Sequence, residues 1–266
     1  MNEKKVAVVT GGTSGIGRAT ALALKDAGCT VYELSRRAEG VEGLHHISAD
    51  VTDENAVNAA VAQVIAAEGQ IDILVNNAGF GISGAIEFTS TTDARSLFDV
   101  NFFGMVNMNR AVVPLMRAAG HGRIVNLSSV AAPVPIPFQA YYSATKAAVN
   151  AYTMALANEL RPFGVTVCAV MPGDIHTGFT AARRKLSEGD DIYQGRISRS
   201  VVRMEHDEQT GMDPAKAGAY IAKVALRSGS NHPLYAIRFD YKFFAFLAKV
   251  LPARFLNWLI YLPYGK

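Results

Sequence analysis

The alternation of short apolar segments with longer helical patterns constrains the fold of this 266-residue chain more than any other feature. The apolar segments are short and uninterrupted, which is typical of strands that are buried on both faces of a parallel sheet. They span residues 6–10, 30–34, 71–76, 123–128 and 165–171. Helical patterns cover residues 15–27, 54–68, 92–119 and 142–160. This order predicts an α/β fold with a single doubly wound parallel sheet (a Rossmann fold) and helices on both faces.

Two regions depart from the alternation, but no linker separates them from the rest, so we expect one domain over residues 1–266. Residues 178–213 are polar and charged, and we expect a mobile loop over the substrate end of the sheet. Residues 235–266 are aromatic and apolar, with Pro252 in the middle. They predict a helical C-terminal extension of two short helices that meet at the proline.

Composition excludes several classes of protein. Half of the residues are hydrophobic and the formal charge is only +3, with no dense block of Lys or Arg, so we expect no nucleic-acid partner. Cys29 and Cys168 lie in apolar stretches without disulfide or metal-ligand spacing, and we expect buried free thiols and no metal. Residues 1–5 lead directly into the first apolar segment, and no segment is long enough to span a membrane. We therefore expect a cytoplasmic protein.

A glycine-rich segment, Thr10-Gly11-Gly12-Thr13-Ser14-Gly15-Ile16-Gly17, joins the first strand to the first helix. Its glycines allow a sharp turn, close approach of the backbone to phosphate oxygens, and tight packing of helix on strand. The helix N-terminus adds free N–H groups and the positive end of its dipole. We therefore predict that a dinucleotide pyrophosphate contacts Gly11, Thr13, Ser14, Gly15, Ile16 and Gly17.

The end of the second strand indicates which dinucleotide binds. Folds of this kind often place a carboxylate there to bind the adenosine ribose 2′-hydroxyl. Here Glu33 lies inside the strand, and Ser35, Arg36 and Arg37 follow at its end. Because a hydroxyl and guanidinium groups can bind a 2′-phosphate, we predict NADP(H) rather than NAD(H) as the cofactor.

Tyr142 and Lys146 are four residues apart on one face of a predicted helix. A nearby ammonium group would lower the pKa of the tyrosine from about 10 toward working pH, which would suit it to proton transfer. The preceding strand ends at Ser128 and Ser129, at the sheet edge where open α/β folds bind ligands. We expect one of these serines to serve the turn and the other the substrate.

These motifs, with Asn76-Asn77-Ala78-Gly79, Asn101 and Pro172-Gly173, resemble the short-chain dehydrogenase/reductase family over roughly residues 5 to 180. The resemblance implies that Ser129 orients a substrate carbonyl, that Tyr142 is the proton donor or acceptor, and that Lys146 assists Tyr142 and binds the nicotinamide ribose. It also implies that Asn101 holds a water molecule in a proton relay. The further cofactor contacts that it implies are Asp50 and Val51 at the adenine, Asn77, Ala78 and Gly79 along the adenosine, and Pro172, Gly173, Ile175 and Thr177 at the carboxamide.

Residues 171–179 look similar to the hydroxysteroid and retinol dehydrogenase branch of that family. We therefore expect the interconversion of a carbonyl and a secondary alcohol on a hydrophobic substrate such as a hydroxysteroid or retinoid, in a pocket lined by residues 79–82, residues 135–138 and Phe179. One alternative is a 3-oxoacyl thioester reductase, for which Arg183, Arg184 and Lys185 would face an acidic carrier. Another is a non-catalytic NADPH-sensing module.

The apolar C-terminal extension leaves three interpretations open. It packs on its own domain or on a second subunit, it roofs a pocket for a lipophilic substrate, or it makes peripheral contact with a membrane surface, because Lys242, Lys249 and Arg254 are interspersed in it. The helices predicted over residues 92–119 and 142–160 have more apolar surface than one sheet face covers. We therefore expect a homodimer or homotetramer.

Overall fold

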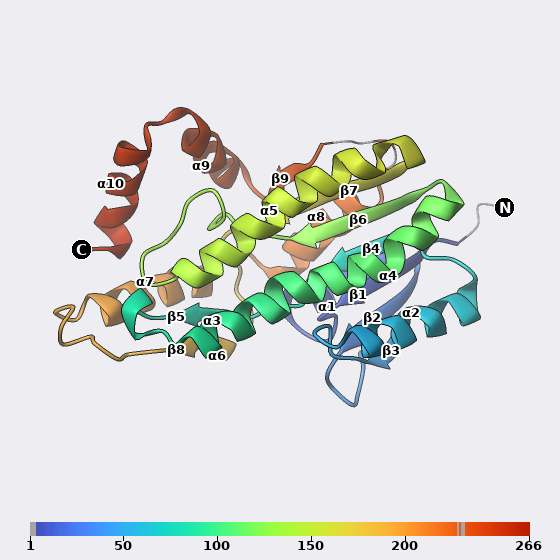
Figure 1. The fold of residues 1–266 in the computed structure, drawn as a ribbon, viewed down its shortest axis with the longest axis horizontal. Coiled ribbons are helices and arrows are strands. Elements are labelled where there is room, and N and C mark those ends of the chain that lie inside the picture. Colours follow the sequence, from blue (N-terminus) through green and yellow to red (C-terminus); the bar gives the residue numbers. More distant parts are fainter. Residues whose placement is uncertain (1–3, 228, 230–231) are drawn as a thin grey trace.

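The protein folds around a seven-stranded, entirely parallel sheet, as Figure 1 shows for the computed structural model, which describes residues 4–227, 229 and 232–266. The strand order is β3-β2-β1-β4-β6-β7-β9. These strands are β1 (Val6–Thr10), β2 (Thr30–Ser35), β3 (His45–Ser48), β4 (Ile73–Asn76), β6 (Gly122–Leu127), β7 (Val165–Met171) and β9 (Leu234–Ala236). The predicted doubly wound Rossmann fold is confirmed. Residues 1–3, which belong to the N-terminal segment considered above, lie outside the described residues.

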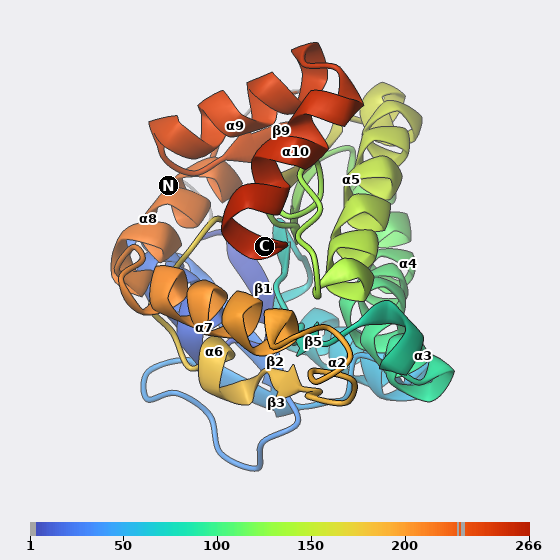
Figure 2. The same cartoon turned by 90° about the vertical axis from the view of Figure 1, so that its left-hand side faces the viewer.

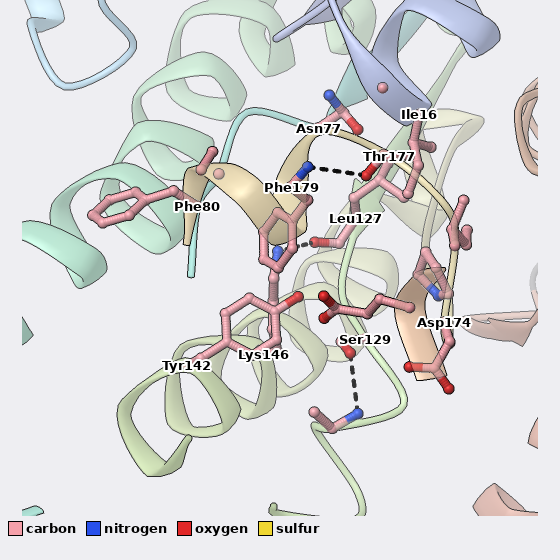
Figure 3. Close-up of a pocket in the computed structure, with 18 of the residues that line it drawn as sticks. Ile16, Asn77, Phe80, Leu127, Ser129, Tyr142, Lys146, Asp174, Thr177 and Phe179 are labelled. Atoms are coloured by element: carbon pink, nitrogen blue, oxygen red, sulfur yellow. Dashed lines mark hydrogen bonds between the residues drawn. The ribbon is translucent and has the colours of Figure 1, made fainter. Parts of the chain in front are cut away.

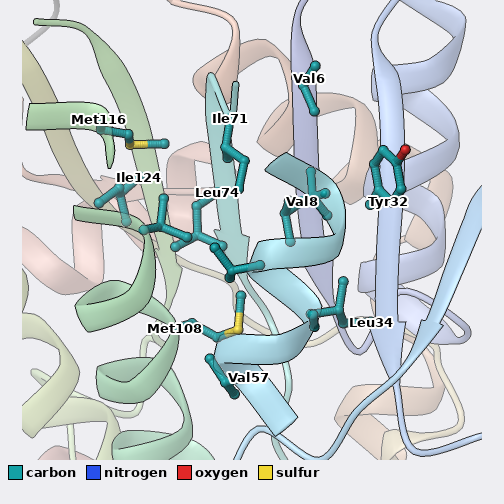
Figure 4. Packing of buried hydrophobic residues seen from close by; sticks show 14 of the residues in the cluster. Val6, Val8, Tyr32, Leu34, Val57, Ile71, Leu74, Met108, Met116 and Ile124 are labelled. Carbon is teal, nitrogen blue, oxygen red and sulfur yellow. The ribbon is translucent and has the colours of Figure 1, made fainter. Parts of the chain in front are cut away.

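Helices cover both faces of the sheet. On one face lie α1 (Gly15–Asp26) and α8 (Pro214–Ala225), and on the other lie α2 (Glu54–Glu68), α4 (Gly104–Ala119) and α5 (Ala140–Leu160). Figure 4 shows the second face, where Leu74 of the sheet packs near Val57 and Met108. Each such buried aliphatic side chain stabilises the fold by about 1.5–3 kcal/mol relative to its exposed state. The free thiols of Cys29 and Cys168 are buried, as expected.

The sheet reverses its direction of growth between β1 and β4. The chain adds β2 and β3 on one side of β1 and then crosses over to add β4, β6, β7 and β9 on the other side. In open parallel sheets, ligands bind at the carboxyl ends of the strands beside such a reversal. The glycine-rich segment after β1 and Asn77 after β4 meet at this place, where the Asn77 Nδ2 donates to the Thr10 carbonyl oxygen at 3.0 Å.

The predicted helix over residues 92–119 is interrupted. The structure has α3 (Thr91–Phe98), then a π-helical turn over Asp99–Phe103, and then α4. The widened turn holds Asn101, whose Oδ1 accepts from the Phe80 N–H at 3.0 Å and whose Nδ2 donates to the Phe80 carbonyl oxygen at 3.0 Å. These contacts come from a distant loop, so the local apolar periodicity could not reveal the interruption.

Residues 178–213 contain more regular structure than expected of a loop. They include α6 (Phe179–Ala182), β8 (Arg184–Lys185) and α7 (Arg196–Gln209), and β8 pairs with β5 (Ile82–Ser83). Figure 2 shows α6 and α7 on one side of the carboxyl end of the sheet. The mobility of this segment stays a prediction.

The C-terminal extension consists of two helices, α9 (Phe239–Val250) and α10 (Ala253–Tyr264), with Pro252 immediately before α10. It lies beyond the carboxyl end of the sheet, and the end of α10 approaches α7 (Figures 1 and 2). The Arg196 Nε donates to the Gly265 carbonyl oxygen at 2.6 Å, which fastens α10 to α7. Within the part of the chain that the structure describes, no helix is long and apolar enough to cross a membrane.

Candidate active site

A cavity of about 360 Å³ opens at the carboxyl end of the sheet, between the glycine-rich segment, the start of α5, and α6 with α7 (Figure 3). Most of the predicted site residues line it, namely Gly11, Ser14, Gly15, Ile16, Arg37, Asn77, Ala78, Gly79, Ser129, Tyr142, Lys146, Pro172, Gly173, Ile175 and Thr177. The other predicted residues, which are Thr13, Gly17, Ser35, Arg36, Asp50, Val51 and Asn101, lie outside its lining. Within the described residues, no group of three or more His, Cys, Asp or Glu side chains could hold a metal ion.

The glycine-rich segment has the geometry of a phosphate-binding turn. Gly11 and Gly15 have φ angles of +64° and +52°, which favour glycine. A Cβ on Gly17 would lie 2.3 Å from both the Asn77 Nδ2 and the Gly11 carbonyl oxygen, so only glycine lets α1 start this close to the turn. Ser14, at the N-cap of α1, makes no side-chain capping hydrogen bond. The backbone N–H groups and the helix dipole therefore suit the pyrophosphate of a dinucleotide.

Asn77 and Thr10 hold the two sides of the crevice together. The Thr10 Oγ1 accepts from the N–H groups of Asn77 and Ala78, each at 3.0 Å. The Asn77 side chain also donates to the Gly11 carbonyl oxygen at 3.3 Å. These bonds fix the residues after β4 against the glycine-rich segment, so the predicted adenosine and pyrophosphate contacts lie on neighbouring chain segments.

The end of β2 presents cationic and hydroxyl groups rather than a carboxylate. Glu33 is fully buried, and its Oε1 lies 2.6 Å from the His46 Nδ1. Ser35 ends the strand, its Oγ accepts from the Arg37 N–H at 3.3 Å, and Arg37 lines the cavity. The Arg36 Nη1 lies 4.0 Å from the Asp50 Oδ2, and the Arg36 side chain is largely open to solvent whereas that of Asp50 is 39% exposed.

Tyr142, Lys146 and Ser129 come together at the opposite end of the cavity (Figure 3). Tyr142 and Lys146 lie one turn apart on α5, and the Lys146 Nζ is 5.7 Å from the centre of the tyrosine ring. The same Nζ donates to the carbonyl oxygen of Leu127, at the end of β6, at 2.8 Å. This bond joins α5 to the sheet edge and sets the position of the ammonium group.

Burial dominates the acid–base properties of this pair. It raises the pKa of Tyr142 to about 12, against the opposing effects of a hydrogen bond with Ser129 and the charge of Arg183. Burial also lowers the pKa of Lys146 to about 8. The sequence predicts that Lys146 lowers the pKa of the tyrosine, but desolvation of the phenolate outweighs the attractive charges around it. The hydroxyl of Tyr142 is therefore held in its protonated form at neutral pH.

Ser128 and Asn101 serve the framework around these groups. The Ser128 Oγ donates to the Lys146 carbonyl oxygen at 3.0 Å, so this serine fixes α5 to the end of β6. Asn101 is engaged with the Phe80 backbone, and its Nδ2 also lies 3.3 Å from the Thr145 Oγ1. The water-holding role of Asn101 stays a prediction.

Several residues that the sequence did not predict also line the cavity, because tertiary contacts bring them to it. They are Gln139, Asp174, Met204, Glu208 and Tyr264. Glu208 on α7 accepts from the Thr180 Oγ1 at 2.6 Å and pairs with the buried guanidinium of Arg183. Asp174 is half-buried, its Oδ2 accepts from the Tyr241 hydroxyl at 2.8 Å, and burial raises the pKa of its carboxyl. Of these residues, only Asp174 follows a motif visible in the sequence, Pro172-Gly173.

The apolar lining is smaller than expected. Phe80, Ile136 and Phe179 line the cavity, whereas the other residues predicted for its apolar wall, apart from Gly79, do not. The ring centres of Phe179 and Tyr142 are 5.7 Å apart, so an apolar side chain flanks the tyrosine.

A family model described as short chain dehydrogenase matches residues 5–188. The chain belongs to this family. It is an oxidoreductase of the NAD(P)(H)-dependent type that acts on carbonyl and alcohol groups. As the sequence predicted, the glycine-rich segment, Tyr142 and Lys146 all lie within the matched residues.

Three known proteins are similar to this chain in sequence or structure. The chain is 41% identical over 228 residues to a protein of Bacteroides thetaiotaomicron named 3-ketodihydrosphingosine reductase, with 85% of each chain covered. A short-chain dehydrogenase from Streptomyces avermitilis has a similar structure, with a TM-score of 0.85, 34% identity, and 97% of each chain covered. The 3-ketoacyl-(acyl-carrier-protein) reductase of Brucella melitensis, solved in complex with NADH, has a TM-score of 0.73 and 27% identity, with 88% of this chain and 96% of that chain covered.

We expect Gly17→Ala to weaken the binding of NADPH at least about tenfold, because the added methyl group displaces Asn77 or Gly11 from the phosphate-binding turn. Gly178→Ala is the matched control, since Gly178 also lines the cavity but an added Cβ there meets nothing within 4 Å. Both affinities can be measured by NADPH fluorescence titration. Equal affinities in the two variants would contradict the assignment of this turn.

Proposed function

We propose that this protein is an NADPH-dependent reductase of long-chain amino ketones, of the 3-keto sphingoid base class. The observation that carries the reaction type is the convergence of Ser129, Tyr142 and Lys146 at one end of a cavity whose other end is a phosphate-binding turn. The observation that favours the substrate is the 41% identity to the Bacteroides protein over 85% of both chains.

The proposed mechanism uses the half-buried Tyr142 as an acid. A bound nicotinamide cofactor supplies the hydride that reduces the carbonyl carbon. Ser129 donates a hydrogen bond to the carbonyl oxygen, and Tyr142 transfers its hydroxyl proton to that oxygen as negative charge develops there. The Lys146 ammonium group then stabilises the phenolate that Tyr142 becomes. The raised pKa of Tyr142 keeps its hydroxyl protonated throughout the neutral pH range, so the proton is in place when the ketone binds.

Groups at the end of β2 support NADPH as the cofactor. The single carboxylate inside that strand, Glu33, is buried against His46 and faces away from solvent. Ser35, Arg36 and Arg37 occupy the strand end instead, and guanidinium groups bind phosphate with charge-assisted hydrogen bonds. The Brucella reductase, whose fold is similar, was solved with NADH, so we assign the proposed preference for NADPH to these side chains rather than to the fold.

The charges at the substrate end of the cavity suit a cationic lipid. 3-Ketodihydrosphingosine is a single-chain lipid whose ketone stands next to a carbon that bears an amine. Asp174 and Glu208 line the cavity, and both lie close enough to Tyr142 for their charges to raise its pKa. Because Glu208 is paired with Arg183, Asp174 is the carboxylate that we expect to attract an ammonium group next to a ketone positioned at Tyr142. Phe80, Ile136, Phe179 and Met204 offer apolar contacts to the chain.

A hydroxysteroid or retinoid stays a second lipophilic candidate, and neither carries a cation for the Asp174 carboxylate. A 3-oxoacyl thioester is the alternative that the Brucella reductase supports. The basic patch expected for an acidic carrier is neutralised, however, because Arg183, Arg184 and Lys185 form ion pairs with Glu208, Asp93 and Glu205 respectively. Turnover of any ketone would exclude a purely NADPH-sensing role.

The pairing of α4 and α5 between two copies of the chain, in a homodimer or homotetramer, also stays a prediction.

The first test is NADPH oxidation at 340 nm with 3-ketodihydrosphingosine, the same ketone without its amine, a 3-oxoacyl thioester, a steroid ketone and retinal. We expect the amino ketone to have the highest kcat/KM. Tyr142→Phe should lower this value by about 10²–10⁴-fold, because it removes the acid. NADPH affinity in that variant should stay unchanged. A higher kcat/KM for the thioester, or near-normal turnover by Tyr142→Phe, would refute the proposal.

The pH dependence of reduction follows from Lys146. Its ammonium form is present below its lowered pKa of about 8 and is lost above it, so kcat should fall as the pH rises through about 8. In Lys146→Arg the side chain stays charged, and the fall should move to higher pH even if the maximal rate is lower. The measurement is kcat against pH for both proteins with saturating NADPH. The same inflection in both would show that another group titrates.

Cofactor preference is the third test. We expect the KM for NADPH to be at least about tenfold lower than that for NADH, because Arg37 and its neighbours attract the 2′-phosphate. Arg37→Glu should narrow or reverse this ratio by repelling the phosphate. Arg161→Glu is the control, because Arg161 is also exposed but lies just before β7, which is on the other side of β1 from β2. An NADH preference in the unmodified protein would refute this part of the proposal.

A further inference from the structure

The outer surface of the C-terminal helix pair is unusually apolar for solvent-exposed helices. On α9 and α10 the exposed large apolar side chains are Phe243, Phe244, Phe246, Val250, Phe255, Trp258, Tyr261 and Leu262. Phe246 is 57% exposed and Trp258 is 53% exposed, so these rings are not core residues of their own domain. We call this set the tail surface. Contiguous apolar patches of this kind mark sites of interaction.

The spacing of these residues places them in stripes. Phe243, Phe246 and Val250 follow one another at three and four residues on α9, and Phe255, Trp258 and Leu262 do the same on α10. Residues with this spacing lie on one face of a helix. Each helix therefore presents an apolar stripe, and the two helices contact each other as a hairpin at one end of the molecule (Figures 1 and 2).

The charges around the tail surface indicate its partner. Residues 241–266 contain four Lys or Arg and no Asp or Glu. The four cations, Lys242, Lys249, Arg254 and Lys266, are all exposed. Aromatic and aliphatic stripes flanked by lysine and arginine are typical of helices that lie in the interface of an anionic membrane. A second copy of the same chain would bring like charges together, which opposes self-association through this surface.

Helix length decides how the helices would meet a bilayer. Each has 12 residues and is thus about 18 Å long, which is shorter than the hydrocarbon core of about 30 Å. They therefore lie on a membrane rather than cross it.

The helix pair is connected directly to the cavity. The Tyr241 hydroxyl on α9 accepts from the Asp174 N–H at 2.9 Å, and Tyr264 on α10 lines the cavity and donates to the Asp207 Oδ2 at 3.0 Å. A Cβ on Gly173 would lie 2.0 Å from the Tyr241 ring, so α9 sits tightly on the segment beside the cavity. A surface that binds the tail would therefore lie next to the cavity opening.

We propose that the tail surface docks the protein onto an anionic lipid bilayer, with the cavity opening beside the lipid, so that a single-chain substrate enters from the membrane. The entry of substrate rests on the proposed function, whereas the docking itself does not. Basic residues at the rim attract the anionic headgroups, and the aromatic stripes enter the interfacial layer.

Vesicle binding tests the docking without any turnover. Trp258 is the only tryptophan of the chain, so its fluorescence reports the tail surface alone. On adding vesicles of phosphatidylglycerol and phosphatidylcholine to the full-length protein, we expect a blue shift of the emission, quenching by lipids brominated near the headgroup, and co-sedimentation. Vesicles of phosphatidylcholine alone should bind more weakly.

Matched variants separate docking from folding. The double variant Phe243→Glu, Phe246→Glu should bind anionic vesicles at least about tenfold more weakly, because two apolar contacts are lost. Lys242→Glu, Lys249→Glu should lose the preference for anionic lipid. Phe163→Glu, which changes an exposed aromatic residue outside the tail, should bind like the unmodified protein. All variants should keep the unmodified melting temperature and NADPH affinity.

Absence of vesicle binding by the unmodified protein would overturn the proposal. So would a blue shift that follows protein concentration instead of lipid, with dimers in sedimentation that Phe243→Glu, Phe246→Glu abolishes, because the partner would then be a second copy of the chain. Vesicle binding without reduction of the amino ketone would support the docking and refute the proposed substrate. A failure of the docking proposal can therefore be distinguished from a failure of the substrate proposal.

Discussion

The parallel pairing of β1, β4 and β6 is the constraint on which the rest of the site depends. Because these strands run in the same direction, their carboxyl ends meet at one edge, and the segments that follow them are held within hydrogen-bond distance. Thr10 at the end of β1 accepts from the backbone N–H of Asn77 after β4, and Leu127 at the end of β6 accepts from Lys146. A shift of one residue in the pairing of β1 with β4, or of β4 with β6, would move the glycine-rich segment relative to Tyr142 and Lys146.

Burial then decides the chemistry of the groups that the sheet brings together. Tyr142 and Lys146 both lose hydration, so the pKa of the phenol rises and that of the ammonium group falls. The tyrosine therefore remains protonated while the lysine titrates near pH 8. This arrangement suits the proposed transfer of a proton to a developing alkoxide.

The part of the cavity beyond the tyrosine is built from segments far along the chain. Glu208 and Met204 come from α7, Tyr264 comes from α10, and Tyr241 of α9 holds Asp174 in place. Because α9 and α10 also carry the exposed apolar stripes, the proposed substrate recognition and the proposed membrane docking would share this helix pair. Such an arrangement gives a lipid a short path from a bilayer to the reacting groups.

Sequence alone determined the architecture and the two ends of the site. Uninterrupted apolar strands with helices between them predict a parallel sheet that is covered on both faces. The glycine spacing and the Tyr142–Lys146 spacing are local properties of one turn and one helix. The π-helical turn at Asn101, the ion pairs of Arg183, Arg184 and Lys185, and the carboxylates of Asp174 and Glu208 in the cavity were decided by tertiary structure. Each depends on contacts between segments distant in sequence. The pKa values of Tyr142 and Lys146 belong with them, because burial is a property of the assembled fold and not of any short stretch of chain.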